Sequence, residues 1–281
     1  MDIFHIQRIL DDFMDDSPLE CLDKSAARKP ELAGMRFYDG FLIGCTPATD
    51  EYLAELPSVS EAGLPNFLPP LEWLPTGRTV ISIFAMFSSL VRSSNRLSHD
   101  KPSHEWLHAR REGQQCLDAV TAHLCEQLSA AGHKTVAPNL DSRFWSKPAH
   151  KEGDPADRPP FSSNWSERHV AYAAGLGTFG LSRGLITRGG VAGRLTSVIT
   201  ELSLPVTPKQ YSGLYDYCSM CGVCAEKCPG GAISLKHGKD HEKCSAFLGT
   251  VRAENNPYFG CGKCQVGVPC ETCLPPQRDS D

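Results

Sequence analysis

A cysteine-rich segment near the end of the printed sequence constrains the fold of this chain more than any other feature. It contains the run C-x2-C-x2-C-x3-C-P, formed by Cys218, Cys221, Cys224, Cys228 and Pro229. In bacterial ferredoxins the first three cysteines of such a run bind one [4Fe–4S] cluster, and the fourth binds a second cluster. The run therefore predicts a small ferredoxin-like module with two [4Fe–4S] clusters.

Crossed ligation assigns the cysteines of this segment to the two clusters. Nine cysteines follow residue 217, whereas two clusters need eight ligands. We expect one cluster to be bound by Cys218, Cys221, Cys224 and Cys270, and the other by Cys228, Cys244, Cys261 and Cys264. Cys273 competes with Cys270 for the last place. Cys270 is preferred because it lies nearer in sequence to the Cys261/Cys264 pair.

Zinc binding and disulfide formation are two other possible uses of these cysteines. A zinc site uses four thiolates in paired C-x2-C knuckles, and the pairs Cys261/Cys264 and Cys270/Cys273 alone would satisfy that pattern. A zinc site of this kind does not explain Cys218, Cys221 and Cys224, which follow one another with two residues between each pair. A disulfide framework requires an oxidising compartment, and the acidic, amphipathic start of the chain does not have the pattern of a signal peptide. The cluster interpretation is therefore favoured, in a reducing cytoplasm.

Composition limits the class of protein further. The formal net charge of −5 over 281 residues argues against a general nucleic-acid binder, and for this reason we expect no tRNA partner. No apolar run approaches the roughly 20 residues of a membrane helix, so no membrane association is expected. Without the cysteine-rich segment, the remaining residues are numerous enough to form their own core. We expect two domains, at residues 1–205 and 206–281.

The first of these domains has the pattern of an α/β body. Amphipathic helices are predicted at 2–15 and 104–131, because apolar residues recur there at helical spacing. The nearly continuous apolar run 79–87 predicts a central strand covered on both faces, and 37–45 and 195–202 also resemble strands. A helix at 166–174 is expected, with Ser166 as its N-cap. Strands separated by helices indicate an α/β fold with the cysteine module appended.

Gly175, Gly177 and Gly180 match the G-x-G-x-x-G fingerprint of dinucleotide-binding proteins. That fingerprint works only when a strand precedes it and a helix follows, with an acidic residue about 20 positions on. Here a predicted helix precedes the glycines and an extended segment follows. We therefore expect no nicotinamide cofactor, and we interpret the glycines as a tight turn where the backbone approaches another group closely.

The glycine turn and the cysteine segment together resemble the epoxyqueuosine reductase family. These are cobalamin-dependent iron–sulfur enzymes of tRNA modification, related to reductive dehalogenases. The resemblance covers 167–202, where Ala-Gly-Leu-Gly is followed by another glycine, and 218–270, where the segments around Cys244 and Cys261 match the family's second cluster motif. It implies a nitroreductase-like body of the corrinoid-processing type, and a corrinoid held against Gly175, Gly177 and Gly180.

The chain departs from the family at one functional position. The resemblance implies an aspartate, acting as proton donor, shortly before the glycine turn, and a gapless count places Phe161 there. Asp157 or Asp141 would take this position only through an insertion. The other candidate donors are His169, Tyr172 and Glu167, which lie close to the turn. Asn164, Trp165, Arg168 and Arg183 flank the turn, where they either contact the corrinoid or form ordinary polar surface.

Two functions of different classes follow from these patterns. The first is a cytoplasmic oxidoreductase in which two [4Fe–4S] clusters reduce a bound corrinoid and, through it, an unknown substrate. Its electron donor would be a low-potential protein such as ferredoxin or flavodoxin. The alternative is a non-catalytic electron-transfer or activator protein that delivers electrons to a corrinoid protein or another redox partner. The replacement of the aspartate by Phe161 favours the alternative.

Overall fold

A computed structural model describes residues 1–58, 64–147 and 158–276. Its centre is a four-stranded sheet in the order β1-β2-β8-β3. The strands are β1 (Tyr38–Pro47), β2 (Thr79–Phe87), β8 (Gly193–Thr200) and the short β3 (Thr135–Val136). Every pairing in this sheet is antiparallel. The predicted central strand is confirmed, since β2 pairs with β1 on one side and with β8 on the other.

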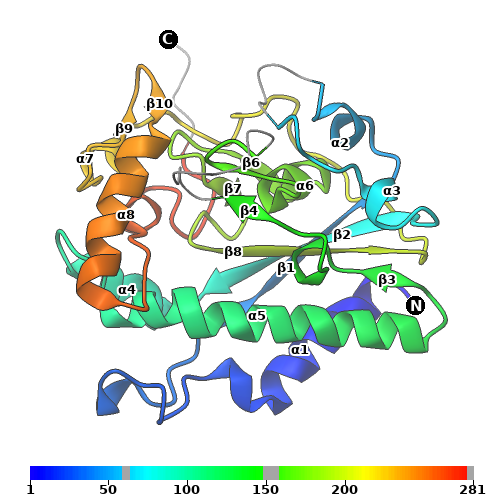
Figure 1. Ribbon diagram of the computed structural model, residues 1–281, viewed down its shortest axis with the longest axis horizontal. Coiled ribbons are helices and arrows are strands. Elements are labelled where there is room, and N and C mark those ends of the chain that lie inside the picture. Colours follow the sequence, from blue (N-terminus) through cyan, green and yellow to red (C-terminus); the bar gives the residue numbers. More distant parts are fainter. Residues whose placement is uncertain (59–63, 148–157, 277–281) are drawn as a thin grey trace.

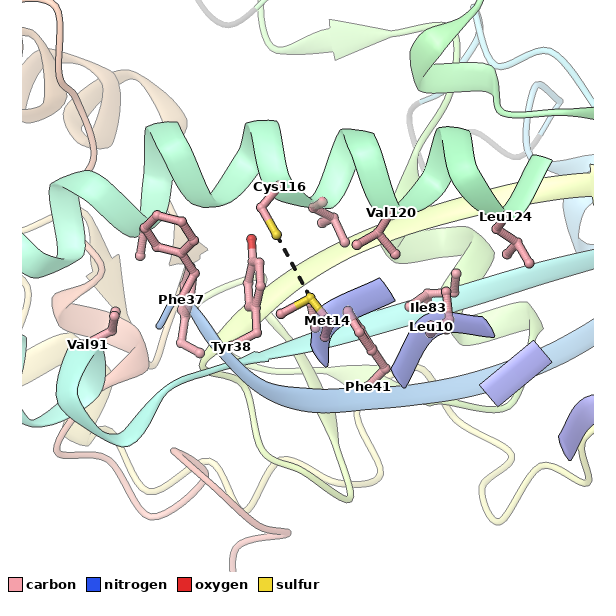
Figure 2. Close-up of a cluster of buried hydrophobic side chains, with 14 of the residues drawn as sticks. Leu10, Met14, Phe37, Tyr38, Phe41, Ile83, Val91, Cys116, Val120 and Leu124 are labelled. Atoms are coloured by element: carbon pink, nitrogen blue, oxygen red, sulfur yellow. Dashed lines mark hydrogen bonds between the residues drawn. The ribbon is translucent and has the colours of Figure 1, made fainter. Parts of the chain in front are cut away.

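Helices α1 (Ile3–Asp16) and α5 (His104–Ala130) cover one face of the sheet (Figure 1). Leu10 and Met14 of α1 meet Val120 and Leu124 of α5 and Ile83 of β2 in a single apolar core (Figure 2). These helical side chains recur at intervals of three or four residues, which places them on one side of each helix. The same core contains Cys116, whose Sγ lies 3.9 Å from the sulfur of Met14.

The opposite face of the sheet is covered by α2 (Glu51–Glu55), α3 (Pro70–Trp73) and α6 (Glu167–Ala173) (Figure 1). Val80 and Phe84 of β2 point to this side, where they join Val170 and Ala171 of α6. Alternate residues of β2 thus enter two different cores, because successive side chains of a strand point to opposite faces. This explains why the strand is apolar on both faces, with Thr79 and Ser82 as its polar residues.

The cysteine-rich module lies at one end of the sheet, beside α4 (Ser89–Leu97) and the first turns of α5 (Figure 1). It consists of short elements around one longer helix: α7 (Val223–Glu226), β9 (Ile233–Ser234), β10 (Gly238–Lys239) and α8 (His241–Asn255). The ring of Tyr258 packs edge-on against His108 of α5, with ring centres 5.0 Å apart. Asn95 of α4 donates a hydrogen bond to the Cys261 carbonyl at 3.0 Å. The module is therefore packed directly on the body.

Helix α4 was not predicted, whereas the extended segment expected after the glycines is present as a strand. Helix α4 begins at the N-cap Ser88, whose side chain accepts a hydrogen bond from the Val91 backbone N–H. The glycine segment forms a hairpin of β6 (Gly177–Phe179) and β7 (Leu185–Thr187) directly after α6. A helix therefore precedes the glycines and a hairpin follows them, so the strand–turn–helix arrangement of a dinucleotide-binding turn is missing at this position.

The remaining short elements connect these layers. They are the two-residue strands β4 (Ser146–Lys147) and β5 (Ser162–Ser163) and the 3-10 turns Pro18–Glu20, Pro30–Leu32, Pro138–Leu140 and Lys263–Gln265. No helix in the described ranges has both the length and the apolar character needed to cross a membrane.

Candidate functional site

Cys218, Cys221, Cys224 and Cys270 line one cavity of the module. Cys218 and Cys221 lie in the loop that leads into α7, and Cys224 is the second residue of that helix. Gly222, the N-cap of α7, adopts a left-handed backbone with φ of 83°. The tight spacing of these cysteines curls the loop around the cavity. The Leu181 backbone N–H, from the loop of the β6–β7 hairpin, points to the Cys218 sulfur at 3.4 Å.

Main-chain contacts with the body hold Cys270 at this cavity. Its carbonyl accepts a hydrogen bond from the Val191 N–H at 2.8 Å. The next residue, Glu271, is 5% exposed and forms an ion pair with Arg96 of α4. Cys273 is exposed, and the residues recorded around the cavity do not include it. The structure thus brings Cys270 to the first three cysteines.

A second cavity of the module is lined by the other four predicted ligands, which are Cys228, Cys244, Cys261 and Cys264. Cys244 lies in the first turn of α8. Trp106 of α5 also lines this cavity, and its buried indole Nε1 has no hydrogen-bond partner among the described residues. Gly262, between the last two cysteines, has φ of 67°, and any Cβ at this position would overlap with the Trp106 ring.

The buried cysteines are weak acids in this environment. Desolvation raises the pKa of Cys224, Cys261 and Cys270 to about 12. Thiols of this kind become thiolates when they bind a cation, because the bound metal supplies the stabilising charge that the surrounding protein does not.

A third cavity, larger than the two lined by cysteines and about 510 Å³ in volume, lies between the body and the module in the described part of the chain. Residues of α6, β8 and the β6–β7 loop form its body side, and Lys239, Cys264 and Gln265 form its module side. Arg110, Lys239, Cys264 and Gln265 also line the second cysteine cavity, so the two spaces share a wall. A volume of this size is in the range of small-molecule sites.

Of the three candidate proton donors, only Glu167 is recorded among the residues around this large cavity. His169 and Tyr172 lie instead in an aromatic cluster: the His169 ring is 4.8 Å from Phe179, and the Tyr172 ring is 4.9 Å from Tyr52. Burial lowers the pKa of His169 to about 3, so this imidazole is neutral and cannot donate a proton as a cation. The Tyr172 hydroxyl donates to the Ser212 carbonyl at 3.2 Å.

Glu167 has the chemistry of a proton donor. Burial is the main cause that raises the pKa of its carboxyl to about 7. Its Oε2 accepts a hydrogen bond from the Ser197 hydroxyl at 2.7 Å, and that hydroxyl accepts one from the Trp165 indole at 3.0 Å. Oε1 is buried and has no partner in the described part of the chain. Glu167 thus combines a raised pKa with a carboxyl oxygen that no described group occupies.

The predicted corrinoid-side glycines contact the protein itself. A Cβ at Gly177 would overlap with the Ile186 carbonyl, and one at Gly175 would lie 2.9 Å from the Thr207 carbonyl. Gly180 lines the first cysteine cavity. None of the three lines the large cavity, because Gly177 and Gly180 approach other residues of the hairpin and Gly175 approaches Thr207. The hairpin loop reaches that cavity through Ser182 and Gly184.

Some of the residues that flank the glycine turn line the large cavity, and others have structural roles. Trp165 and Arg168 line the large cavity. Asn164 is buried, and its side chain donates to the Arg143 carbonyl at 2.8 Å and accepts from the Trp145 N–H at 2.9 Å, which is a structural role. Arg183 is exposed and has a left-handed backbone with φ of 62°.

Phe161 contributes no proton donor. Its ring lies 5.5 Å from His241, the first residue of α8, and its backbone φ is 61°. Asp141 forms an ion pair with Arg143 at 2.7 Å, and it is not among the residues recorded around the large cavity. Asp157 lies outside the described residues.

Sequence reasoning missed Arg110, Arg194 and Trp106. Each lies on a helix or strand whose sequence pattern predicts only core packing. Each also lines a cavity whose other lining residues come from distant parts of the sequence. The Arg194 side chain, for example, donates to the Gln114 amide oxygen at 2.8 Å across 80 positions. The local signal for Arg194 was a charged residue at the start of strand β8.

The fold and the cysteine-lined cavities define an α/β protein with a C-terminal iron–sulfur module, and a family model described as "4Fe-4S binding domain" matches residues 214–234. The chain is 32% identical over 114 residues to an epoxyqueuosine reductase of Xanthomonas campestris pv. campestris, a match that covers 37% of this chain and 31% of that protein. A tetrachloroethene reductive dehalogenase of Desulfitobacterium hafniense is 34% identical over 119 residues, which is 37% of this chain and 20% of the dehalogenase. The resemblance to epoxyqueuosine reductases is therefore confirmed.

Solved structures share the fold over a longer stretch. The structure of epoxyqueuosine reductase from Streptococcus thermophilus matches with a TM-score of 0.53 and 16% identity, over 99% of this chain and 69% of that one. A catabolic reductive dehalogenase matches with a TM-score of 0.53 and 14% identity, over 83% of this chain and 30% of the dehalogenase. The predicted fold class, a nitroreductase-like body with a ferredoxin-like module, is confirmed. The sequence matches span about a third or less of the curated relatives.

Proposed function

We propose that this protein is an iron–sulfur reductase in which two [4Fe–4S] clusters reduce a corrinoid in the large cavity and, through it, a substrate. The observation that carries the proposal is the wall shared by the large cavity and the cavity lined by Cys228, Cys244, Cys261 and Cys264. A cluster bound by these cysteines would lie directly beside whatever the large cavity holds. Electrons would then pass over a short distance.

The arrangement of the thiols supports clusters over zinc. Two separate groups of four cysteines surround two cavities, as crossed ligation requires. Within residues 1–58, 64–147 and 158–276, no three His, Cys, Asp or Glu side chains are close enough to hold a single metal ion. The partnerless Nε1 of Trp106 would donate to a cluster sulfur, which is one of the interactions that set cluster potentials.

A corrinoid would supply a strongly reducing cobalt centre, and the protein would bind it, orient it and provide a proton. Residues from both sides of the large cavity would hold it, among them Trp165, Leu195 and Gln265. The protonated carboxyl of Glu167 would deliver the proton to the substrate. This assigns to Glu167 the role that the resemblance gives to an aspartate at the position of Phe161.

The test is the metal and corrinoid content of anaerobically purified protein. We expect close to eight iron and eight sulfide per chain, and binding of added cobalamin seen as a change in its absorption spectrum. Cys221→Ser and Cys244→Ser should each lose one cluster. Cys270→Ser should also lose one, whereas Cys273→Ser, the matched control, should retain both. Stoichiometric zinc with little iron would contradict the proposal.

The second candidate is an electron-transfer or activator protein without a substrate of its own, and Phe161 favours it. In that case the clusters would bind, but added cobalamin would not. Both candidates need a low-potential donor such as ferredoxin or flavodoxin, and both remain compatible with a cytoplasmic location. The exclusion of tRNA also stays a prediction. Binding of an anticodon stem-loop to the cluster-loaded protein would contradict it.

A further inference from the structure

Four cationic side chains surround the large cavity. Arg110 comes from α5, Arg168 from α6, Arg194 from β8 and Lys239 from β10. They belong to four elements from different parts of the sequence. One carboxyl, that of Glu167, is recorded among the lining residues.

No carboxylate in residues 1–58, 64–147 and 158–276 forms an ion pair with any of these four side chains. Arg168 donates to the Arg183 carbonyl at 2.6 Å, and Arg194 donates to the neutral amide oxygen of Gln114. The buried Nε of Arg110 has no hydrogen-bond partner in the described ranges.

Burial and mutual repulsion make the charged form of these arginines less favourable, which lowers their pKa values. Repulsion from Arg194, followed by burial, lowers the pKa of Arg110 to about 9. Burial likewise lowers the pKa of Arg168 and of Arg194. Uncompensated buried cations are unfavourable, and a bound anion relieves both the repulsion and the missing hydrogen bonds.

We propose that the large cavity binds a small organic anion, carrying a carboxylate or a phosphate, as the substrate. Arg168 and Arg194 would hold the anionic group, because both line this cavity without being recorded at the second cysteine cavity. Arg110 and Lys239 line both spaces, so they also face the negative charge of a cluster. Guanidinium groups suit carboxylate and phosphate because their paired N–H groups match two oxygen atoms.

The proposed position of the anion agrees with the rest of the cavity. Glu167 precedes Arg168 in the chain and lines the same space, so a group held by the arginines would lie close to the proton donor. The side chains of Phe84 and Trp165 supply apolar surface in the same cavity. This proposal rests on the proposed function, because it takes the large cavity to be the place of reaction.

Calorimetry on the cluster-loaded protein tests the proposal with benzoate, succinate and inorganic phosphate, and with benzamide as a neutral molecule of similar shape to benzoate. At least one anion should bind, more weakly as salt is raised, and benzamide should not. Arg194→Gln and Arg168→Gln should each weaken binding roughly tenfold or more. Arg188→Gln, at an exposed arginine not recorded at this cavity, is the matched control and should leave the affinity unchanged.

The result that overturns the proposal is that no anion binds better than benzamide, while iron content and cobalamin binding are normal. Loss of clusters or of cobalamin binding would instead contradict the proposed function. A corrinoid can also carry a phosphate in its nucleotide loop. Displacement of the anion by cobalamin, but not by cobinamide, which lacks that phosphate, would assign the arginines to the cofactor and overturn the substrate assignment.

Discussion

The carboxyl group of Glu167 should change its protonation state within the physiological pH range. Because burial raises its pKa to about 7, the carboxyl is protonated below that pH and loses its proton above it. The capacity to donate a proton should therefore fall as pH rises through 7. Glu167→Gln should lower substrate reduction on the order of a hundredfold or more, the usual contribution of a general acid, and should remove this pH dependence.

Infrared difference spectra between pH 6 and pH 8 test the protonation without any substrate. The wild-type protein should lose a carboxylic-acid band with a midpoint near pH 7, and Glu167→Gln should lack that band. Glu55→Gln, at an exposed position on α2, is the control and should keep the band. A band that persists in Glu167→Gln would show that another carboxyl titrates.

Trp106 gives a second prediction at the same scale. Trp106 lines the cavity of Cys228, Cys244, Cys261 and Cys264, and its buried indole N–H has no partner among the described residues, so a cluster sulfur is the acceptor that we expect. Trp106→Phe should lower the reduction potential of one cluster by about 40 mV, the equivalent for one electron of a hydrogen bond of about 1 kcal/mol. Redox titration followed by electron paramagnetic resonance measures this shift.

The control for this measurement is Trp73→Phe. The Trp73 indole donates to the Leu68 carbonyl at 3.1 Å, and the residue lies in the core beneath α6. Its replacement should change stability but neither cluster potential. Equal potentials in Trp106→Phe and wild type would show that the indole does not contact a cluster.

At the scale of elements, the β6–β7 hairpin explains the glycine pattern by internal packing. Gly177→Ala would force a Cβ into the Ile186 carbonyl across the hairpin, which we expect to cost roughly 1–3 kcal/mol. Since the hairpin loop also contacts Cys218 through the Leu181 N–H, iron content should fall together with the unfolding temperature. Gly249→Ala, in α8 with open space around the position, is the matched control and should not destabilise the protein.

This outcome separates two explanations of the glycines. If Gly177 contacted a corrinoid, its replacement would reduce cobalamin binding and leave both iron content and unfolding temperature unchanged. Thermal unfolding and iron analysis of the same anaerobic sample distinguish the two results.

The elements with strong local patterns were predictable from the sequence. Helices α1 and α5 and strand β2 follow directly from the spacing of apolar residues. Helix α4 was missed because only Val91 and Asn95 of its residues are buried, which leaves little periodic signal. The cysteine spacing also predicted which thiols share a cavity. Cationic cavity residues such as Arg110 and Arg194 were not predictable, because they meet only through the antiparallel order of the sheet and the packing of α5 against it.

For the whole molecule, the positions of the cavities would define an order for the two proposed clusters. The cavity of Cys228, Cys244, Cys261 and Cys264 shares a wall with the large cavity, whereas the recorded lining of the cavity of Cys218, Cys221, Cys224 and Cys270 shares only Ser182 with it. Electrons should therefore enter at the Cys218 cluster and leave from the Cys244 cluster. Loss of the two clusters should have different consequences.

Cys244→Ser should abolish reduction of added cobalamin, because no cluster then lies beside the large cavity. Cys221→Ser should slow the reduction of cobalamin by a protein donor such as ferredoxin. It should not change the rate of cobalamin reduction by a small chemical reductant, because such a reductant reaches the remaining cluster directly. Absorption spectra of cobalamin under anaerobic conditions give both rates, and iron analysis confirms that each variant keeps one cluster. Equal rates in the two variants with the chemical reductant would mean that either cluster can reach the cavity, which would contradict the order derived from the shared wall.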